Sequence, residues 1–354
     1  MSINLLTKYE TQIYDIVFIT NIPAFYKINL YNEINKKKKI LVIFISEKSF
    51  NRIDDFYKGD KNFEYIYLDS GFYEKRNSKK NSLKLIKVLN SKKYKKIILG
   101  GWDSLENWTA WLLSSKKQNA VIVESSEFES THKGVKGLLK KIFVQKISLG
   151  FASGDSQKKL LKNIGYKGEI RKTKGVGIFN YNRVSIKREI SEVKKFLYVG
   201  RLSEEKNLEQ IINIFNKIPN LKLTIVGYGP LEKKLKNIAN CNIEFLGKVE
   251  NKNLSRIYQE HDVFILPSKS EPWGLVVEEA LYNGKPVIVS NRVGCHTEII
   301  QENIHGYICN IDEDEELVNK IKLISKIEVY NAIRKNVENI DFEFIKRHQV
   351  DSYF

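Results

Sequence analysis

The sequence has few of the residues that mark disulfide-rich, metal-binding or membrane-spanning proteins. Its 354 residues include three cysteines, five histidines and one methionine. The cysteines are odd in number and lack metal-ligand spacing, which favours buried thiols in a reducing compartment over a disulfide framework. No window approaches 18 apolar residues and no signal-like apolar run follows Met1. We therefore expect a cytosolic protein without a transmembrane or secretory segment.

Acidic residues are scarce in the first half of the chain. Residues 1–190 hold 37 Lys and Arg against 18 Asp and Glu, whereas residues 191–354 hold 22 against 24. The net charge of +17 therefore belongs to the first half. This asymmetry suggests an anionic partner such as a membrane surface, a phosphorylated lipid or nucleic acid. The alternative is a composition that reflects codon usage, with lysines that only keep the surface soluble.

Short runs rich in β-branched residues alternate with helical patterns throughout the chain. In the first half these predicted strands lie at residues 15–20, 40–46, 63–68, 96–101, 120–125 and 148–154. In the second half they lie at residues 195–200, 222–229, 243–247, 262–268, 286–291 and 305–310. Near-continuous apolar strands between helices predict parallel sheets covered on both faces.

Two such series predict an α/β protein with two doubly wound, Rossmann-like domains. We place them at residues 1–180 and 190–335, because the stretch 179–194 is polar and lies where the charge balance changes. A C-terminal helix within 336–354 could pack back on the first domain. Ligands of such sheets bind at the carboxyl ends of the strands, so we expect a site in the cleft between the domains.

Two cations follow the first strand of the second half, which ends at Gly200. Arg201 comes next, and Ser203 is predicted to begin a helix that carries Lys206 near its N-terminus. Because Arg grips oxygens in a fork and helix amides add donors, this combination suits a diphosphate. The alternative is a loop with two surface cations. The next strand ends at Gly227, which allows a tight turn close to a ligand.

Two glutamates flank the start of an apolar helix predicted from about residue 274 to 283. Free amides of Gly274 and Leu275 would attract phosphate oxygens. Glu279 lies about five residues farther along, roughly 7–8 Å at 1.5 Å per residue, within reach of a ribose diol that donates hydrogen bonds. Glu271 precedes the helix, on the other side of the phosphates, where a sugar would lie.

Several linked motifs resemble a known family. The motifs are GRLSEEKN, VGYGP, IEFLGKV, DVFILPSKSEPWGLVVEEAL and GKPVIVSNRVGCHTEII. Their order and spacing resemble those of the retaining GT-B glycosyltransferases of family GT4, also called glycosyl transferases group 1. The resemblance is strong from about residue 195 to 310 and weaker before that.

This resemblance implies a role for each motif residue. Arg201 and Lys206 would neutralise the diphosphate of a nucleotide sugar. Glu271 would bind hydroxyls of the donor sugar and Glu279 would hold the ribose. The amides of Gly274 and Leu275 would donate to the distal phosphate, and Gly200 and Gly227 would line the donor site.

The expected reaction needs no metal ion or other cofactor. The leaving nucleotide diphosphate gains negative charge as the glycosidic bond breaks, so fixed cations and helix amides stabilise the transition state. The resemblance implies retention, with the departing phosphate accepting the proton of the acceptor hydroxyl. The acidic run DEDEEL, which starts at residue 312, could suggest a metal site, but we interpret it as a solvated helix N-terminus.

The resemblance assigns acceptor binding to the first half, where the match is looser. In place of the Gly-Gly loop of many members, the first strand is followed by Pro23, Tyr26 and Lys27. The usual cleft histidine is also missing, and Glu124 and Ser125 end the strand at its place. We predict that Glu124 lies beside the reacting carbon instead. The alternative is a carboxylate that caps the next segment.

Two further features of the first half have a functional and a structural interpretation. Trp102 follows Gly-Gly at the end of a strand and could wall the acceptor pocket or belong to the core. Residues 131–147 predict a basic amphipathic helix that could lie on anionic lipid or meet a lipid pyrophosphate. The alternative is an ordinary helix that buries one face on the sheet.

Together these features favour a glycosyltransferase of bacterial surface-glycan synthesis, for O-antigen or capsule. It would move a hexosyl-type sugar from a nucleotide-diphosphate donor to a lipid-linked oligosaccharide or polysaccharide, at the inner face of the plasma membrane. A nucleotide-sugar epimerase or phosphorylase with the same fold is the alternative. A basic nucleic-acid-binding protein is more remote, and we expect no nucleic-acid partner because no recognised module occurs.

Overall fold

The computed structural model describes residues 13–50, 52, 54–127, 129–179, 181 and 190–354. The chain divides into two compact units. The first contains the described residues up to 123 together with 134–151 and 164–170, and the second contains 124–133, 152–163 and the described residues from 171 to 354. Segments 124–133 and 152–163 therefore group with the second unit, which the boundaries expected from the sequence do not anticipate.

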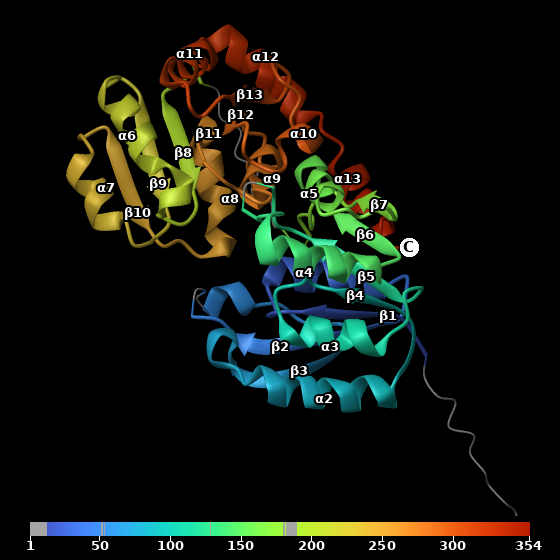
Figure 1. The fold of residues 1–354 in the computed structure, drawn as a ribbon. Helices are drawn as coiled ribbons and strands as arrows, with labels where there is room; N and C mark the ends of the chain where they lie inside the picture. The colour runs from blue at the N-terminus through green and yellow to red at the C-terminus, as the bar shows by residue number, and fades with distance from the viewer. Residues whose placement is uncertain (1–12, 51, 53, 128, 180, 182–189) are drawn as a thin grey trace, which may run out of the picture. The chain divides into compact units, whose positions relative to one another are not determined.

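The first sheet has seven strands in the order β3-β2-β1-β4-β5-β6-β7 (Figure 1). Its strands are β1 (Ile13–Thr20), β2 (Ile40–Lys48), β3 (Glu64–Phe72), β4 (Lys93–Leu99), β5 (Asn119–Val123), β6 (Leu149–Ala152) and β7 (Glu169–Lys172). The pairs β1–β2, β1–β4, β2–β3 and β4–β5 are parallel. The short strand β7 has no counterpart among the predicted strands.

Helices connect these strands. They are α1 (Phe25–Asn35), α2 (Ser78–Ser91), α3 (Leu105–Leu113), α4 (Gly134–Gln145) and α5 (Asp155–Asn163), with short 3₁₀ turns η1 (Asp54–Tyr57) and η2 (Tyr73–Lys75). Because parallel crossovers are right-handed, the reversal of strand order at β1 puts α1 on one face of the sheet and α2, α3 and α4 on the other. Ser104 begins α3 as a side-chain cap, since its hydroxyl accepts the Asn107 N–H at 3.1 Å.

The second sheet has six strands in the order β10-β9-β8-β11-β12-β13. Its strands are β8 (Lys195–Val199), β9 (Lys222–Val226), β10 (Ile243–Gly247), β11 (Val263–Leu266), β12 (Val287–Ser290) and β13 (Gly306–Cys309). All five pairings are parallel. The expected doubly wound α/β class is therefore confirmed in both units.

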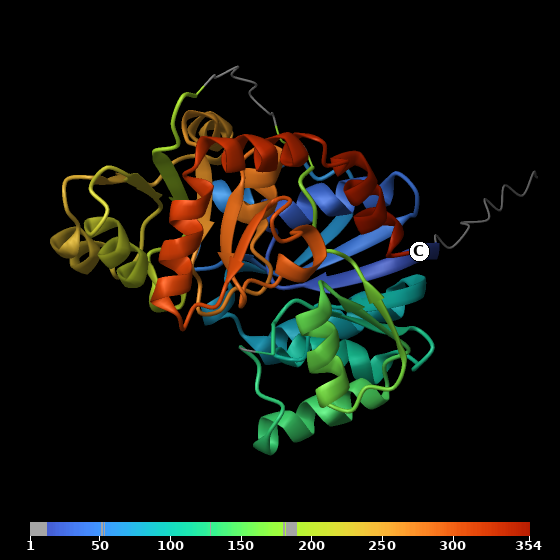
Figure 2. The same ribbon diagram turned by 90° about the horizontal axis from the view of Figure 1, so that it is seen from above.

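The second unit also contains most of the helices. They are α6 (Leu208–Asn216), α7 (Glu232–Ile238), α8 (Asn251–Glu260), α9 (Leu275–Tyr282), α10 (His296–Ile299), α11 (Asp314–Ile324), α12 (Ile327–Glu338) and α13 (Phe342–Asp351), with the 3₁₀ turn η3 (Glu204–Lys206). Figure 2 shows α11, α12 and α13 following one another at the end of the chain. In the described ranges, no helix combines the length and apolar character needed to cross a bilayer.

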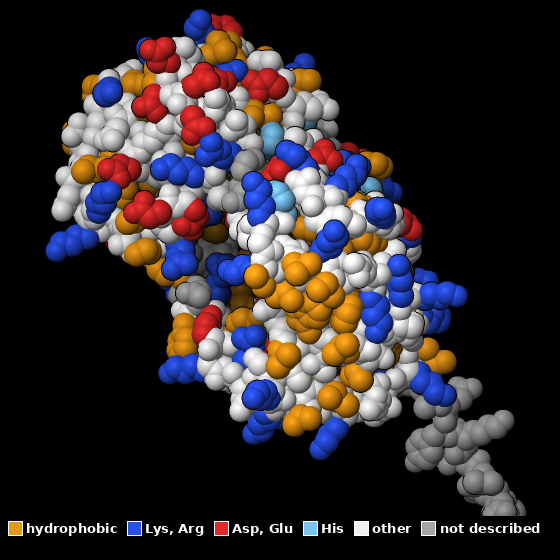
Figure 3. Space-filling model, in the orientation of Figure 1, with side chains coloured by type: hydrophobic (Ala, Val, Ile, Leu, Met, Phe, Trp, Pro, Cys, Tyr) orange, Lys and Arg blue, Asp and Glu red, His pale blue; other side chains and the backbone are white. Residues whose placement is uncertain are grey.

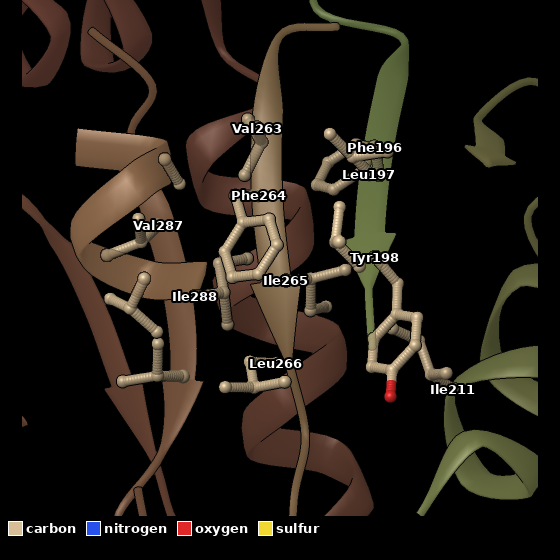
Figure 4. Close-up of a cluster of buried hydrophobic side chains, with 14 of the residues drawn as sticks. Phe196, Leu197, Tyr198, Ile211, Val263, Phe264, Ile265, Leu266, Val287 and Ile288 are labelled. Atoms are coloured by element: carbon tan, nitrogen blue, oxygen red, sulfur yellow. The ribbon is translucent and has the colours of Figure 1, made fainter. Parts of the chain in front are cut away.

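The core of the second unit lies between its central strands and the helices that cover them. Figure 4 shows Phe196 and Tyr198 of β8 beside Phe264 of β11, with Ile211 of α6 against Tyr198. All four side chains are fully buried. Burial of this kind contributes about 1.5–3 kcal/mol for each large apolar side chain, so the two central strands form a rigid base for the loops at their ends.

The last helix, α13, packs within the second unit. The Gln349 side-chain amide donates to the Lys174 carbonyl at 2.6 Å and to the Glu278 carboxylate at 2.9 Å. His348 Nε2 lies 3.2 Å from the Lys172 carbonyl. Helix α13 thus packs on residues 171–174. The boundaries predicted from the sequence put these residues in the first domain, whereas the structure groups them with the second unit.

A buried carboxylate joins the starts of β8 and β11. Asp262 is 1% exposed, and its Oδ2 accepts the amides of Lys194 and Lys195 at 2.9 and 2.8 Å. Removal of this acceptor would leave two donors without their partner.

We expect Asp262→Ala to lower the free energy of unfolding by about 1–3 kcal/mol, because two charge-assisted hydrogen bonds are lost. Urea unfolding followed by circular dichroism measures the change. The control is Glu260→Ala, which removes an exposed ion pair with Arg256 and should change stability by less than about 0.5 kcal/mol. Equal effects of the two substitutions would show that Asp262 is not a structural anchor.

Candidate functional site

Four loops of the second unit meet at the carboxyl edge of its sheet. They follow β8, β9, β11 and β12, which are neighbours or next neighbours in a parallel sheet. The loops after β8 and β9 are joined by backbone hydrogen bonds from Gly200 to Val226 and from Leu202 to Tyr228, both at 3.0 Å. A Cβ on Gly227 would lie 1.8 Å from the Gly200 carbonyl oxygen, so only glycine permits this approach.

The segment after Gly200 differs from the prediction. Ser203 does not begin an α-helix, because residues Glu204–Lys206 form a single 3₁₀ turn and Asn207 has a φ of 56°. Helix α6 begins only at Leu208. The Lys206 amide donates to the Ser203 carbonyl at 3.0 Å, so it is already used within this turn. Lys206 therefore contributes its side chain to the site, without helix amides around it.

Lys206 and Glu271 form an ion pair. The Lys206 ammonium donates to Glu271 Oε2, and each side chain is 15% exposed. The structure thus brings together two residues that the sequence assigned to the diphosphate and to the donor sugar. Arg201 is exposed, and its carbonyl accepts the Tyr198 hydroxyl at 2.9 Å. This bond fixes the backbone of Arg201 and leaves its guanidinium at the surface.

The loop that contains Glu271 is held by the loop after β12. The Glu271 amide donates to the Arg292 carbonyl at 3.2 Å, and the Glu271 carbonyl accepts the Gly294 amide at 2.9 Å. The Cys295 amide donates to the Trp273 carbonyl at 2.9 Å. These bonds fix the backbone on both sides of Pro272. The direction of the Glu271 side chain is therefore set by two loops that are hydrogen-bonded to each other.

Helix α9 begins without a side-chain cap. Its N-cap residue, Gly274, has a φ of 94°, and a Cβ there would lie 2.8 Å from a Val293 methyl group. The first amide that bonds back is that of Val277, which donates to the Gly274 carbonyl at 2.8 Å. The N-terminus of α9 therefore presents amides, Leu275 included, of the kind that bind phosphate oxygens. Gly284, with a φ of 74°, follows the C-cap residue Asn283 and ends the helix.

Glu279 is buried rather than turned to water. It is 7% exposed, and the Tyr258 hydroxyl lies 3.2 Å from its Oε2. Burial raises the pKa of Glu279 to about 7, the Tyr258 hydroxyl opposes this rise, and the charge of Glu278 adds to it. Its other oxygen, Oε1, accepts no hydrogen bond from the residues that the structure describes.

Glu278, which was not predicted from the sequence, is more deeply buried than Glu279. Its oxygens accept the Trp273 indole N–H at 3.0 Å and the Gln349 amide at 2.9 Å, and its pKa is raised by burial to about 7. Glu278 joins the Glu271–Gly274 loop to α13 and so helps to hold that loop in place. The adjacent glutamates in the sequence were the available signal, because neighbours on a helix point about 100° apart and cannot share one partner.

Segment 124–133, which carries Glu124, Glu127 and Glu129, groups with the second unit. The Glu124 carbonyl accepts the Gln157 side-chain amide at 3.1 Å, and the same amide donates to the Pro272 carbonyl at 2.7 Å. Gln157 therefore links the backbone at Glu124, next to the half-buried Ser125, to the loop that contains Glu271. The role predicted for the Glu124 carboxylate stays a prediction.

Glu129, which was not predicted from the sequence, has a carboxyl whose pKa responds to both charges of the ion pair. Its Oε2 accepts the Ser126 amide at 3.3 Å. Burial raises the pKa of Glu129 and the nearby Glu271 charge raises it further, while the Ser126 amide, the Ser270 hydroxyl and the Lys206 charge lower it. The Ser-x-x-Glu spacing of residues 126–129 was the signal in the sequence, since it lets a Glu side chain reach back to the Ser amide.

The other predicted acceptor residues, Tyr26, Lys27 and Trp102, lie in the first unit, whereas Ser125 groups with the second. Tyr26 packs edge-on against Phe25 and Phe56, and Lys27 Nζ lies 3.4 Å from the Thr20 hydroxyl. Trp102 is buried against Phe143, as the core alternative describes.

Other aromatic residues near Tyr26 were not anticipated. Phe50 and Phe72, at the carboxyl ends of β2 and β3, stack at 4.1 Å and are 52% and 37% exposed. The Lys75 ammonium lies 5.0 Å from the Phe50 ring, and the Arg52 guanidinium lies 4.6 Å from the Phe56 ring. This edge of the first sheet therefore offers both aromatic faces and cations.

The acidic run at residue 312 lies at a helix N-terminus, as predicted. Glu313 is the N-cap of α11 and Asp314 its first residue. Asp312 pairs with Arg292, and Asp314 accepts the Gln210 amide at 2.5 Å. In the part of the chain that the structure describes, no three His, Cys, Asp or Glu side chains are grouped so that they could hold a metal ion.

Comparisons with known proteins agree with this geometry. The family described as Glycosyl transferases group 1 matches residues 183–340. Residues 183–340 belong to this glycosyltransferase family. The O-antigen biosynthesis glycosyltransferase WbnH of Escherichia coli is 34% identical over 186 residues, which are 51% of this chain and 52% of WbnH. The sulfoquinovosyl transferase SQD2 of Arabidopsis thaliana is 30% identical over 169 residues, which are 45% of this chain and 33% of SQD2. The chain thus spans about a third to a half of these glycosyltransferases.

Solved structures extend the likeness to the whole fold. The sucrose-phosphate synthase of Thermosynechococcus elongatus has a TM-score of 0.72 at 18% identity, covering 96% of this chain and 98% of that chain. The lipopolysaccharide outer core galactosyltransferase WaaB has a TM-score of 0.69 at 16% identity, covering 96% and 100%. The GT-B fold expected from the motifs is therefore confirmed, and the match of residues 183–340 agrees with the family expected from them.

The raised pKa of Glu279 predicts how stability depends on pH. Its folded pKa of about 7 lies above the ordinary value of 4.5, so the stability that it contributes is present at low pH and is lost as the pH rises from about 4.5 to about 7. We expect Glu279→Gln, which keeps an acceptor for Tyr258, to remove this loss. The variant should gain on wild type between about pH 5 and pH 8 in urea unfolding. Glu315→Gln, at an exposed position, is the control, and parallel curves for wild type and Glu279→Gln would contradict the assignment.

Proposed function

We propose that the protein is a retaining glycosyltransferase that takes a sugar from a nucleotide-diphosphate donor bound to the second unit. The observation that carries the proposal is the Lys206–Glu271 ion pair at the sheet edge where α9 begins without a cap. Such an edge combines a fixed cation, free amides and a carboxylate. These are the groups that a diphosphate and sugar hydroxyls require.

The ion pair is suited to exchange partners with the donor. Without a donor, Lys206 and Glu271 satisfy each other's charge in a site where both are largely buried. A diphosphate would compete for the Lys206 ammonium, and the sugar hydroxyls would donate to the released Glu271 carboxylate. Arg201 would add a second cation, and Glu279 would accept from the ribose through Oε1. Donor binding therefore replaces one ion pair by two sets of charge-assisted hydrogen bonds.

Transfer then breaks one bond and forms one. The bond between the anomeric carbon and the phosphate oxygen breaks, and both electrons leave with the nucleotide diphosphate. The acceptor hydroxyl attacks the same face of that carbon, and its proton passes to a departing phosphate oxygen. Lys206, Arg201 and the α9 amides stabilise the growing negative charge, so the proposed reaction needs no metal ion.

The relatives support a uridine nucleotide and a surface glycan. The solved Anabaena HepE is described with UDP-glucose, and the pneumococcal O-GlcNAc transferase GtfA with UDP and GlcNAc. WbnH is named for O-antigen biosynthesis, and another relative, 30% identical over 193 residues, lies in the cps region of Klebsiella pneumoniae. We therefore propose a hexosyl-type UDP sugar as donor and a bacterial O-antigen or capsule glycan as product.

The acceptor is proposed to be lipid-linked or polysaccharide and to bind the first unit. The exposed Phe50–Phe72 pair offers flat apolar faces for sugar rings, and Lys75 and Arg52 offer charge for phosphate groups. The excess of cations in residues 1–190 would draw this half to an anionic membrane, at the inner face of the plasma membrane. A nucleotide-sugar epimerase or phosphorylase remains the alternative, and it would release a new sugar isomer or sugar phosphate without a glycan acceptor.

A donor panel tests the proposal. We expect UDP-, GDP- and dTDP-sugars to be distinguished by mass spectrometry of products formed with a membrane extract of the source cell. Lys206→Ala should lower kcat by roughly 10²–10³-fold, because one fixed cation no longer stabilises the leaving group. Lys234→Ala, at an exposed ion pair with Glu209, is the matched control and should retain activity. Unchanged activity in both Lys206→Ala and Glu279→Ala would refute the proposed donor site.

Substitution of Glu124 and of Glu129 in turn tests which of the two carboxylates takes part in the reaction. The sequence prediction places Glu124 beside the reacting carbon, whereas the charges of Glu271 and Lys206 both act on the pKa of Glu129, which supports a role for that carboxyl instead. We expect Glu129→Gln to lower kcat by roughly 10²-fold and to change the acid limb of the pH–rate profile, with a smaller effect of Glu124→Gln. The opposite order of effects would restore the assignment to Glu124.

A further inference from the structure

Helix α4 carries an apolar stripe that faces away from the protein. Val135, Leu138, Leu139 and Ile142 follow the i, i+3, i+4, i+7 spacing of one helix face. They are 75%, 58%, 48% and 39% exposed. A stripe with this spacing normally packs on the core, so its exposure calls for a partner outside the first unit's core.

A different face of α4 packs on the first unit. Gly137, Lys140, Phe143 and Val144 are the buried residues of the helix. The Lys140 ammonium lies 5.5 Å from the Trp102 ring, and burial lowers the pKa of Lys140. The alternative given for residues 131–147, a helix that buries one face, is therefore confirmed in part: one face is buried on the first unit, and it is not the face with the apolar stripe. The lipid-binding interpretation stays a prediction.

Helix α3 extends the exposed apolar area. Its leucines Leu105, Leu112 and Leu113 are also exposed, and together with the α4 stripe they form what we call the α3–α4 surface. Figure 3 shows hydrophobic side chains gathered over these two helices, with Lys and Arg side chains around them. Seven large apolar side chains on two neighbouring helices exceed the scattered exposure that is ordinary for a soluble protein.

The two helices are fixed to each other beneath this surface. The Trp111 indole N–H of α3 donates to the Phe143 carbonyl of α4 at 2.8 Å, and the two rings stack at 5.9 Å. Lys146 donates to the Leu112 carbonyl at 2.9 Å. The surface is therefore held in shape by hydrogen bonds and stacked rings and does not need a partner to order it.

The charges next to the α4 stripe are cationic, and the exposed Asp103 just before Leu105 is an acidic side chain at the α3 end of the surface. Residues 131–147 contain no acidic residue. Lys133, Lys136 and Lys141 are exposed next to the α4 stripe, and Lys116 and Lys117 are exposed just after α3. An apolar face with a border of lysines matches the boundary of an anionic bilayer, where acyl chains lie below a layer of phosphates.

We propose that the α3–α4 surface inserts its apolar side chains into the acyl boundary of an anionic bilayer, with the flanking lysines on lipid phosphates. A second copy of this chain is a poorer partner, because two such surfaces would bring their lysines together. The biological role of this surface, bringing the enzyme to a lipid-linked acceptor, rests on the proposed function. In a parallel sheet the helices run against the strands, so the N-termini of α3 and α4, with Leu105 and Val135, lie at the edge proposed for the acceptor. A lipid-linked acceptor would reach that edge from the same bilayer.

Vesicle binding tests the surface. The probe is vesicles of phosphatidylcholine with or without phosphatidylglycerol, with co-sedimentation of the full chain as one readout. Quenching of tryptophan fluorescence by brominated acyl chains is the second, since three of the four tryptophans, Trp102, Trp108 and Trp111, lie in α3 or just before it. We expect binding to the anionic vesicles, with quenching, and weaker binding to phosphatidylcholine alone.

Three variants separate apolar insertion from charge. Leu138→Glu with Leu139→Glu should lower the partition coefficient by roughly tenfold or more, because apolar contact is lost and anionic charge is added. Lys133→Ala, Lys136→Ala and Lys141→Ala together should also lower it by roughly tenfold or more. The matched control is Leu83→Glu, at a leucine of α2 that is 63% exposed and outside the surface, and it should bind as wild type does.

Several results would overturn the proposal. They are no binding of folded wild type to anionic vesicles, equal binding by the Leu138→Glu, Leu139→Glu variant, or a dimer in light scattering that this variant dissociates. Binding of UDP to the same samples, measured in solution by calorimetry, reports on the donor site alone. Vesicle binding without UDP binding would refute the proposed function and support the membrane surface. UDP binding without vesicle binding would support the proposed function and refute the membrane surface.

Discussion

The fixed backbone around Pro272 is the constraint on which the candidate site depends. Hydrogen bonds from residues 292–295 hold it on one side, and Gln157 donates to the Pro272 carbonyl on the other. A Cβ on Gly294 would lie 1.9 Å from that same carbonyl oxygen, so the two loops are in backbone contact. This contact sets both the direction of Glu271 and the position at which α9 starts. The pairing with Lys206 and the free amides of α9 follow from it.

Behind that loop, the protein keeps carboxylates where water cannot reach them. Glu278 accepts hydrogen bonds from Trp273 and from Gln349 of α13, and Glu279 accepts one from Tyr258 through Oε2. Burial disfavours the ionised form of each, which is why both have raised pKa values. The ionised forms of these two carboxylates therefore lower the stability of the fold near neutral pH. A ligand that donates hydrogen bonds to Glu279 would favour the ionised form and recover part of that loss.

Much of this could be predicted from the sequence, because the strands are short, apolar and closed by Gly, Ser or Asn. All twelve predicted strands occur, and α9 lies within one residue of its predicted bounds. The sequence predicted that Lys206 and Glu271 bind different parts of one ligand. It did not predict the ion pair that they form with each other. The failures are local or long-range. Asn207 adopts a left-handed conformation that no periodicity reveals, and the partner of Glu278 lies 71 residues away, in α13.

Helix α4 shows most clearly what periodicity can and cannot decide. Its sequence has apolar residues on two faces, and a hydrophobic pattern does not say which of them meets the core. The answer depends on Phe143, whose ring packs edge-on against Trp108 and stacks on Trp111 of α3, an arrangement set by long-range packing. Once that ring is buried, the helix has no freedom to turn Leu138 and Leu139 inward. The outward stripe is therefore a consequence of core packing, and a chain that keeps it exposed among lysines gains a surface that is apolar and cationic at once.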